Sequence, residues 1–184
     1  MPVTALDAHT ALVVIDLQRG IVDLPTAHPS DGIVRNAAAL AAAFRRHALP
    51  VVLVNVTGGA PGRTEQPPMG QRPDGWSELV PELDRQPTDL LVTKRTWGAF
   101  TNTPLRELLE SKGVTQIVLA GISTSAGVES TARFAHELGL NVTLAIDAMT
   151  DRSLDAHTNS ITRIFPRLGE TGTTQDIIQL LDRS

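Results

Sequence analysis

The 184-residue sequence contains no cysteine, and this absence excludes more chemistry than any other feature of its composition. Without a thiol the chain can form neither a disulfide bond nor a thioester intermediate. A chain without disulfides is consistent with a cytoplasmic protein, which is the location we expect. Tyrosine is also absent, and aromatic residues make up only 3% of the chain, so its core has to be built from Val, Leu, Ile and Ala. Such a core suits a buried parallel β-sheet.

Long apolar runs and basic segments are lacking as well. No run approaches the ~20 apolar residues that a membrane-spanning helix needs, and the N-terminus has neither the basic start nor the apolar centre of a signal peptide. The formal charge at pH 7 is −4, so we do not expect a nucleic-acid partner. The length and composition predict one domain over residues 1–184, with a small molecule as its partner.

Apolar runs alternate along the chain with segments that favour helices. The runs predict strands at residues 11–15, 51–56, 89–93, 117–120, 141–146 and, more briefly, 167–169. Helices are predicted at 33–47, 104–112, 128–138, 153–166 and from 173 onward, with a short helix at 76–83 inside a long loop over 57–87. This alternation predicts an α/β fold of three layers, α/β/α, around a mostly parallel, doubly wound six-stranded sheet.

Polar or small residues directly follow four of the predicted strands. Asp16, Lys94, the loop 121–127 and Asp147 hold these places, and ligands of open α/β sheets bind at the edge that such places share. Asp16 follows five apolar residues, so burial should raise the pKa of its carboxyl, while a nearby Lys94 ammonium would lower it. A carboxyl tuned in this way can donate or accept a proton. A purely structural ion pair is the alternative interpretation.

Several familiar motifs are absent. The serine-hydrolase elbow Gly-x-Ser-x-Gly begins at Gly121, but Ser125 stands where its second glycine is needed, and no histidine directly follows a strand. No Gly-x-Gly-x-x-Gly follows the first strand, and histidine pairs at metal-binding spacing are missing. We therefore expect no cofactor and no metal. A nucleophilic Ser123, Thr124 or Ser125 is kept as a minor alternative.

Three segments together resemble the isochorismatase-like hydrolase superfamily. They are LVVIDLQ at 12–18, TKRTWGAF at 93–100 and GISTSAGVESTA at 121–132, and DAMTD at 147–151 is also typical. By this resemblance Asp16 and Lys94 fill two places of the superfamily's Asp–Lys–Cys triad, and Gly127 stands in the place of the cysteine. Isochorismatases of the superfamily also carry glycine there. They hydrolyse a vinyl ether, which needs a proton on the enol carbon and then water.

The resemblance also implies the remainder of a site. Asp16 would protonate the substrate, Lys94 would orient and tune Asp16, and Gly127 would leave room for the ligand. The N–H groups of Ser123 and Gly127 match the superfamily's oxyanion hole, beside a non-proline cis peptide expected at Ile122–Ser123. The residues implied to bind substrate are Ser123, Thr124, Gln18, Arg95, Trp97 and Phe100.

Two departures from the superfamily bear on the substrate. The Asp and His metal ligands that nicotinamidases carry after the second strand are missing, which argues against amidase activity of that kind. Isochorismatases place an arginine two residues after the lysine, where this chain has Thr96. Arg63 or Arg72 of the long loop are then the candidates for a contact with a substrate anion.

The sequence therefore predicts a metal-independent hydrolase of a small anionic molecule, with vinyl-ether hydrolysis as the reaction type. The alternative, which the missing cysteine motivates, is a non-catalytic protein that binds a small molecule on a hydrolase scaffold. Members of the superfamily are usually oligomers, so the resemblance implies a homo-oligomer, either a dimer or a tetramer.

Overall fold

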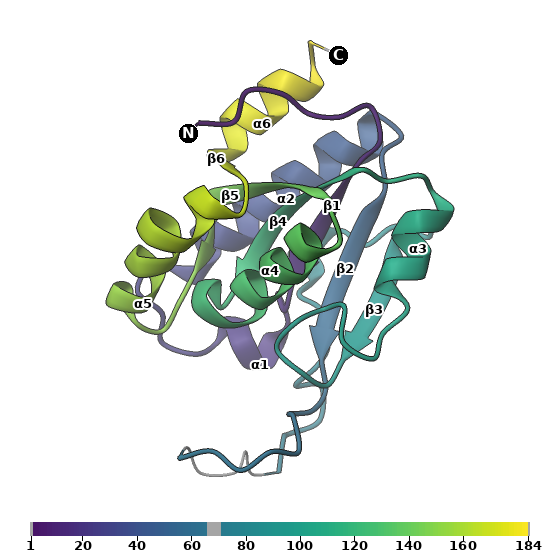
Figure 1. The fold of residues 1–184 in the computed structure, drawn as a ribbon. Helices are drawn as coiled ribbons and strands as arrows, with labels where there is room; N and C mark the ends of the chain where they lie inside the picture. The colour runs from purple at the N-terminus through teal and green to yellow at the C-terminus, as the bar shows by residue number, and fades with distance from the viewer. Residues whose placement is uncertain (1, 66–70, 184) are drawn as a thin grey trace.

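A computed structural model describes residues 2–65 and 71–183, and its centre is a sheet of six parallel strands (Figure 1). Their order is β3-β2-β1-β4-β5-β6, so the winding reverses between β1 and β4. The strands are β1 (Thr10–Ile15), β2 (Val51–Val56), β3 (Leu90–Lys94), β4 (Gln116–Ile122), β5 (Asn141–Thr150) and β6 (Glu170–Gly172). The predicted doubly wound parallel sheet is confirmed.

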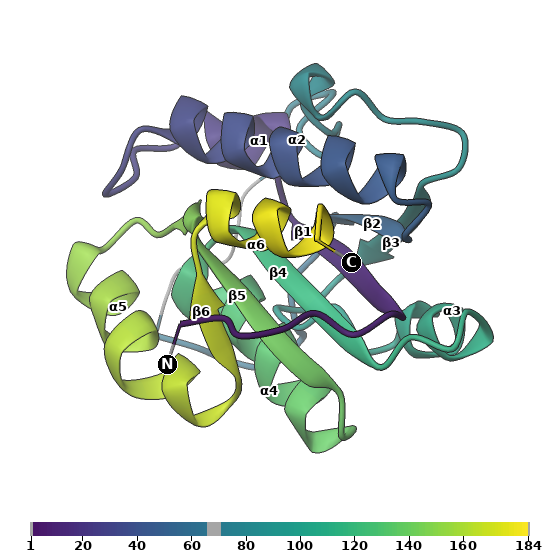
Figure 2. The same ribbon diagram turned by 90° about the horizontal axis from the view of Figure 1, so that it is seen from above.

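Helices cover both faces of this sheet (Figure 2). One face carries α2 (Ser30–Arg46) and α6 (Thr174–Leu181). The other carries α3 (Leu105–Ser111), α4 (Glu129–Glu137) and α5 (Leu154–Asn159). A short helix, α1 (Arg19–Val22), follows β1 at the edge where the strands end. No helix was predicted for these four residues.

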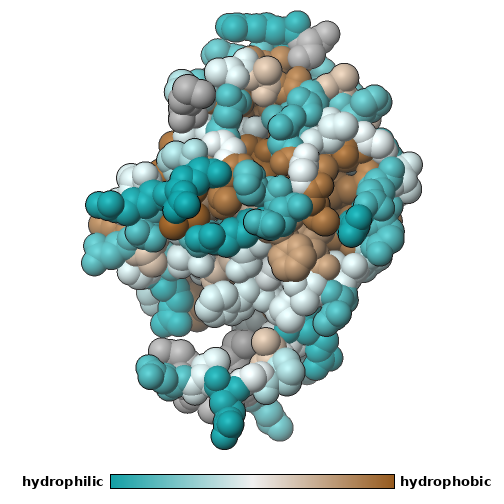
Figure 3. All heavy atoms as spheres, viewed as in Figure 1, coloured by the Kyte–Doolittle hydropathy of each residue, from teal (hydrophilic) through white to brown (hydrophobic). Residues whose placement is uncertain are grey.

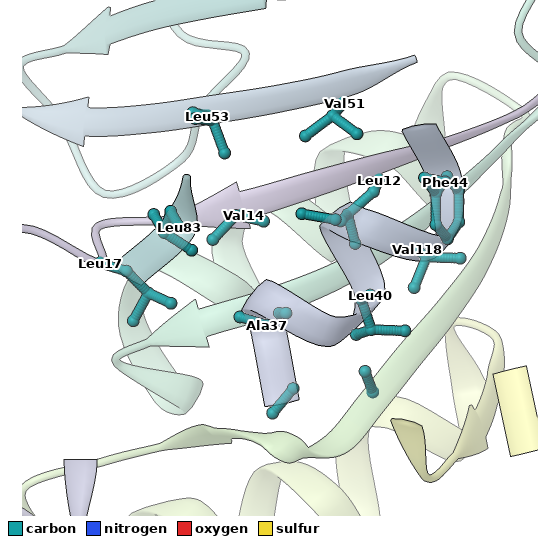
Figure 4. Packing of buried hydrophobic residues seen from close by; sticks show 14 of the residues in the cluster. Leu12, Val14, Leu17, Ala37, Leu40, Phe44, Val51, Leu53, Leu83 and Val118 are labelled. Carbon is teal, nitrogen blue, oxygen red and sulfur yellow. The ribbon is translucent and has the colours of Figure 1, made fainter. Parts of the chain in front are cut away.

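The two hydrophobic cores follow from the period of two along the strands. In β1, Leu12 and Val14 face α2, whereas Val13 and Ile15 face the opposite layer. The apolar residues of α2 recur every three or four positions, and Leu40 and Phe44 pack over β1 (Figure 4). Each such fully buried side chain contributes about 1.5–3 kcal/mol of burial free energy. The strand ends are thereby held in fixed positions.

Two predicted elements, the sixth strand and the helix at 76–83, are wrong in detail. The sixth strand is at Glu170–Gly172 and not at 167–169, because Pro166 belongs to a 3₁₀ turn over Phe165–Arg167 that delays the strand. The helix predicted at 76–83 is reduced to one 3₁₀ turn, Pro81–Leu83.

No helix of the described chain is long and apolar enough to cross a membrane.

The fifth strand also runs further than predicted, and this corrects the place of Asp147. The register between β4 and β5 shifts between Leu119 and Gly121, and pairing resumes up to Thr150. Asp147 therefore lies within β5. Its Oδ1 accepts hydrogen bonds from the N–H of Thr174 at 2.7 Å and from the Thr174 hydroxyl at 2.9 Å, which anchors the start of α6.

The loop over 57–87 was predicted to be a lid or a binding loop, and its residues 66–70 lie outside the described part. On either side of them the chain projects away from the body of the molecule (Figure 1). The returning segment packs against α1, because a Cβ atom on Gly20 would stand 1.9 Å from the Trp76 ring. Gly20 thus provides the space in which the Trp76 ring packs against α1.

Candidate active site

A buried ion pair lies at the edge where the parallel strands end. Lys94 is the last residue of β3, Asp16 follows β1, and the Lys94 Nζ lies 2.6 Å from the Asp16 Oδ2. Asp16 is only 5% exposed and Lys94 only 2%. Asp16 has a φ of +53°, a left-handed conformation that aspartate tolerates better than most residues. The carboxyl and the ammonium lie together, as their positions after two parallel strands predict.

The Asp16 carboxyl keeps one oxygen available. Burial raises the pKa of Asp16 to about 6, although the Lys94 charge and hydrogen bond act in the opposite direction. The Oδ1 atom is buried, and no residue in the described part of the chain hydrogen-bonds it. An unsatisfied buried acceptor costs about 1–3 kcal/mol, a cost that a ligand or a proton on this oxygen would relieve. The Lys94 Nζ also donates to the Thr96 carbonyl at 3.1 Å, which fixes the ammonium.

Gly127 lies directly against this carboxyl. It belongs to η2, a single π-helical turn over Thr124–Val128 that joins β4 to α4. A Cβ atom on Gly127 would stand 3.4 Å from the Asp16 Oδ2 and 2.8 Å from the Ile15 Cγ2. The position that the resemblance assigned to the missing cysteine therefore lies in contact with the acid, and it has no room for a side chain unless Ile15 moves.

We expect Gly127→Ala to destabilise the fold by about 1–3 kcal/mol, which is the usual cost of forcing an extra methyl into a packed site. Urea unfolding measures this difference. The matched control is Gly62→Ala, where an added Cβ meets nothing within 4 Å. Equal stability of the two variants would contradict the close packing of Gly127 on Ile15.

Thr131 on α4 holds the Gly127 turn to the loop that follows β3. Its side chain is fully buried. The hydroxyl donates to the Gly127 carbonyl at 2.6 Å and accepts from the Ala99 N–H at 3.0 Å. Sequence reasoning missed this residue, because a threonine four positions after a glycine has no distinguishing pattern.

The loop between β4 and η2 contains the expected cis peptide at Ile122–Ser123. Within the residues described, no group accepts a hydrogen bond from the Ser123 N–H, so this amide can serve a ligand. Thr124 is fully buried and its hydroxyl lies 2.8 Å from the His157 Nδ1. The Ser125 hydroxyl and N–H both donate to the Asp151 Oδ2 at 2.8 Å. The alternative of a nucleophilic Ser123, Thr124 or Ser125 stays a prediction.

Gln18 has a different position from the one expected of a substrate-binding residue. It is fully buried, its Oε1 accepts from the Val56 N–H at 2.7 Å, and its Nε2 donates to the carbonyls of Val56 and Trp76. Both polar atoms of the side chain therefore bond backbone groups, at the last residue of β2 and at Trp76 in the loop that follows. Gln18 thus supports the ends of β1 and β2.

Phe100 also points into the protein. It is 8% exposed and belongs to the core beneath α4, where its ring stacks on Phe134 with centroids 6.2 Å apart. Trp97 is 68% exposed, and its carbonyl lies 3.5 Å from the place of a Gly127 Cβ. In the view of Figure 1, hydrophobic residues are exposed in the middle of the molecular surface (Figure 3). The predicted homo-oligomer stays a prediction.

Arg95 and Arg72, two of the arginines implied to contact substrate, lie beside Gly58. Arg95 is exposed, and a Cβ on Gly58 would stand 3.0 Å from its Cβ and Nε. Arg72 stacks over the Trp76 ring at 4.0 Å and donates to the Gly58 carbonyl at 3.2 Å. Arg63 is exposed. Residues 2–65 and 71–183 contain no group of three or more His, Asp or Glu side chains that could hold a metal ion.

Comparison with known proteins identifies the class to which this fold and site belong. Residues 10–176 match the isochorismatase domain. The uncharacterized isochorismatase family protein YecD of Escherichia coli O157:H7 is 43% identical over 182 residues, covering 94% of this chain and 96% of the relative. YwoC of Bacillus subtilis (strain 168), which has the same description, is 42% identical over 178 residues, covering 92% and 93%.

A solved structure agrees with these relatives. An isochorismatase family protein from Burkholderia thailandensis superposes with a TM-score of 0.93 at 42% identity, covering 97% of this chain and 98% of that one. The chain belongs to the isochorismatase family and is a hydrolase of that family.

Proposed function

We propose that this hydrolase cleaves a small anionic vinyl ether, with Asp16 as the general acid and without a metal ion. The observation that carries the proposal is the Asp16 carboxyl itself. It is buried, its pKa is raised to about 6, its Oδ1 has no partner among the described residues, and it lies against a glycine. A general acid is most effective when its pKa lies near the working pH.

The reaction needs a proton and a water molecule, but no nucleophile from the protein. Asp16 donates its proton to the terminal vinyl carbon, which becomes a methyl group, and the ether oxygen stabilises the resulting oxocarbenium ion. Water adds to the cationic carbon and loses a proton, which restores the acid. The hemiketal then collapses to a ketone and an alcohol. Gly127 places no side chain against the Asp16 carboxyl, where a Cβ atom would stand 3.4 Å from Oδ2.

Lys94 acts on this step through Asp16. Its ammonium is held by the Asp16 Oδ2 and the Thr96 carbonyl, so it favours the carboxylate that remains after proton transfer. The Ser123 N–H offers a hydrogen bond to an oxygen of the substrate or of the hemiketal. Arg95 and Arg63 are exposed cations in or beside the loops that follow β2 and β3, where they can attract an anionic substrate.

The test is a substrate panel of isochorismate, simple carboxylated vinyl ethers, small amides and esters, each assayed from pH 5 to 9. We expect turnover of vinyl ethers. The value of kcat/KM should fall about tenfold per pH unit above pH ~6, because only protonated Asp16 is active. A rate that rises with pH through this range would show that Asp16 acts as a base. Tight binding with no consumption would favour the non-catalytic alternative.

A further inference from the structure

A second cavity, of about 560 Å³, lies between the amino end of α2 and β5. The amino end of α2 and α5 lie on the same side of the molecule (Figure 2). Asp16, Lys94 and Gly127 do not line this cavity, so it is separate from the site described above. Its wall combines two imidazoles, one guanidinium, one amide, two carboxylates and an apolar part.

The two imidazoles are those of His28 and His157, whose ring centroids are 4.7 Å apart. The His157 ring is 7% exposed, and its Nδ1 is engaged by the Thr124 hydroxyl. The Nδ1 of His28 lies 3.0 Å from the Thr150 hydroxyl. No residue of the described chain hydrogen-bonds the Nε2 atom of either ring. The cavity is thus lined by a nearly buried polar ring that has one unused nitrogen.

The first turn of α2 adds further donors. This 17-residue helix begins after Pro29 with no side chain capping its N–H groups, and such an end favours an anion. The Arg35 guanidinium folds back over this turn, since a Cβ on Gly32 would stand 3.8 Å from its Nη2. Among the described residues Arg35 forms no ion pair.

Acidic groups do not cancel these donors. The Asp147 carboxylate is held at the amino end of α6 by two hydrogen bonds from Thr174. Asp31 is exposed on the first turn of α2, where water screens it. The apolar part of the wall comes from Ile33, Ile146 and Met149. This combination matches a ligand that has an anionic head and a compact apolar body.

We propose that this cavity is a binding site for a small organic carboxylate. Its head group takes hydrogen bonds from the Nε2 atoms of His28 and His157 and from Arg35 near the amino end of α2. Its body packs against Ile33, Ile146 and Met149. Because the Thr124 hydroxyl contacts His157 and Thr124 follows Ser123, an occupied cavity lies one hydrogen bond away from the loop of the candidate active site.

Binding should strengthen as the pH falls. Burial, and next the charge of His28, lower the pKa of His157, so the free ring is neutral at pH 7, while Asp151 opposes this shift. A carboxylate beside the ring favours the imidazolium, and therefore binding takes up a proton. The charged or titratable groups that face this ring or line the cavity are His28, Asp31, Arg35, Asp147 and Asp151.

The experiment follows the imidazole Cε1–H signals by NMR during titration with benzoate, with benzamide as the uncharged analogue of the same shape. We expect saturable shifts of His28 and His157 with benzoate only, and at least fivefold tighter binding at pH 6 than at pH 8. His9 and His136, which do not line the cavity, serve as internal references.

Variants separate the cavity from a surface effect. Arg35→Gln should weaken benzoate binding at least fivefold, and Gly32→Leu, which fills the cavity, should abolish it. Arg46→Gln removes an exposed cation at the other end of α2 and should change nothing. The proposal is overturned by equal shifts with benzamide, by unshifted His28 and His157, by full binding to Gly32→Leu, or by shifts with inorganic phosphate alone. None of these outcomes depends on turnover at Asp16.

Discussion

Asp16→Asn should lower kcat/KM for a vinyl-ether substrate by about 10²–10⁴-fold, which is the usual contribution of a general acid. The amide has nearly the same shape as the carboxyl and keeps an oxygen near the Lys94 ammonium, but it has no proton of suitable acidity. The reaction then depends on protons from water. Steady-state rates on the best substrate of the panel, measured at pH 6, give the ratio directly.

This variant also leaves the Lys94 charge buried without a carboxylate, so we expect a stability loss of about 3–5 kcal/mol. The assay is therefore run at low temperature, and circular dichroism verifies that the variant is folded. Asp23→Asn, which changes an exposed aspartate at the end of α1, is the matched control and should retain full activity. A folded Asp16→Asn protein with an unchanged rate would remove Asp16 from the mechanism.

Lys94→Met should move the pH dependence by one unit or more. The Lys94 ammonium lowers the pKa of Asp16 against the larger effect of burial, so without it the pKa of Asp16 rises further above 6. The falling part of the kcat/KM profile shifts to higher pH accordingly. We also expect a lower maximal rate, because the hydrogen bond that orients the carboxyl at 2.6 Å is lost.

The stability of Lys94→Met should depend on pH in a defined direction. A carboxyl whose pKa is raised in the folded state contributes stability that is fully present below its unfolded value, near 3.8, and is lost as the pH rises through the folded value. The variant should therefore be nearly as stable as the original protein at pH 5. At pH 8 it should be less stable than the original protein by about 1.4 kcal/mol for each unit by which the loss of Lys94 raises the pKa of Asp16.

Urea unfolding at the two pH values measures this difference, and the kinetic profile measures the shift in activity. Lys112→Met, at the exposed end of α3, is the control and should change neither quantity. A profile that stays in place or moves to lower pH would contradict the assignment of Lys94 as the residue that tunes Asp16.

The sequence was sufficient to bring Asp16, Lys94 and Gly127 together. Each of them lies at the end of a strand or in the loop after one, and each of these strands is an apolar run in the sequence. Parallel strands all end at the same edge of the sheet. The resemblance then added the cis peptide at Ile122–Ser123, which the structure has. Positions that depend on the backbone path of strands and their connections can therefore be predicted from the sequence alone.

Positions that depend on irregular strand pairing and on side-chain direction could not be predicted from the sequence. Asp147 follows an apolar run, but the register shift between Leu119 and Gly121 places it inside β5. Gln18 lies two residues after the left-handed turn at Asp16, yet its side chain bonds the backbone of Val56 at the end of β2. The Thr124–His157 contact joins residues 33 positions apart, and no local pattern indicates it.

The most direct measurement is the titration of the Asp16 carboxyl carbon by ¹³C NMR, with the signal assigned by its absence in Asp16→Asn. The proposed mechanism requires a titration near pH 6, because burial outweighs the ammonium beside the carboxyl. A midpoint below pH 4 would contradict it. Asp16 would then stay ionised at every working pH, as a mere counterion of Lys94 with no proton to give.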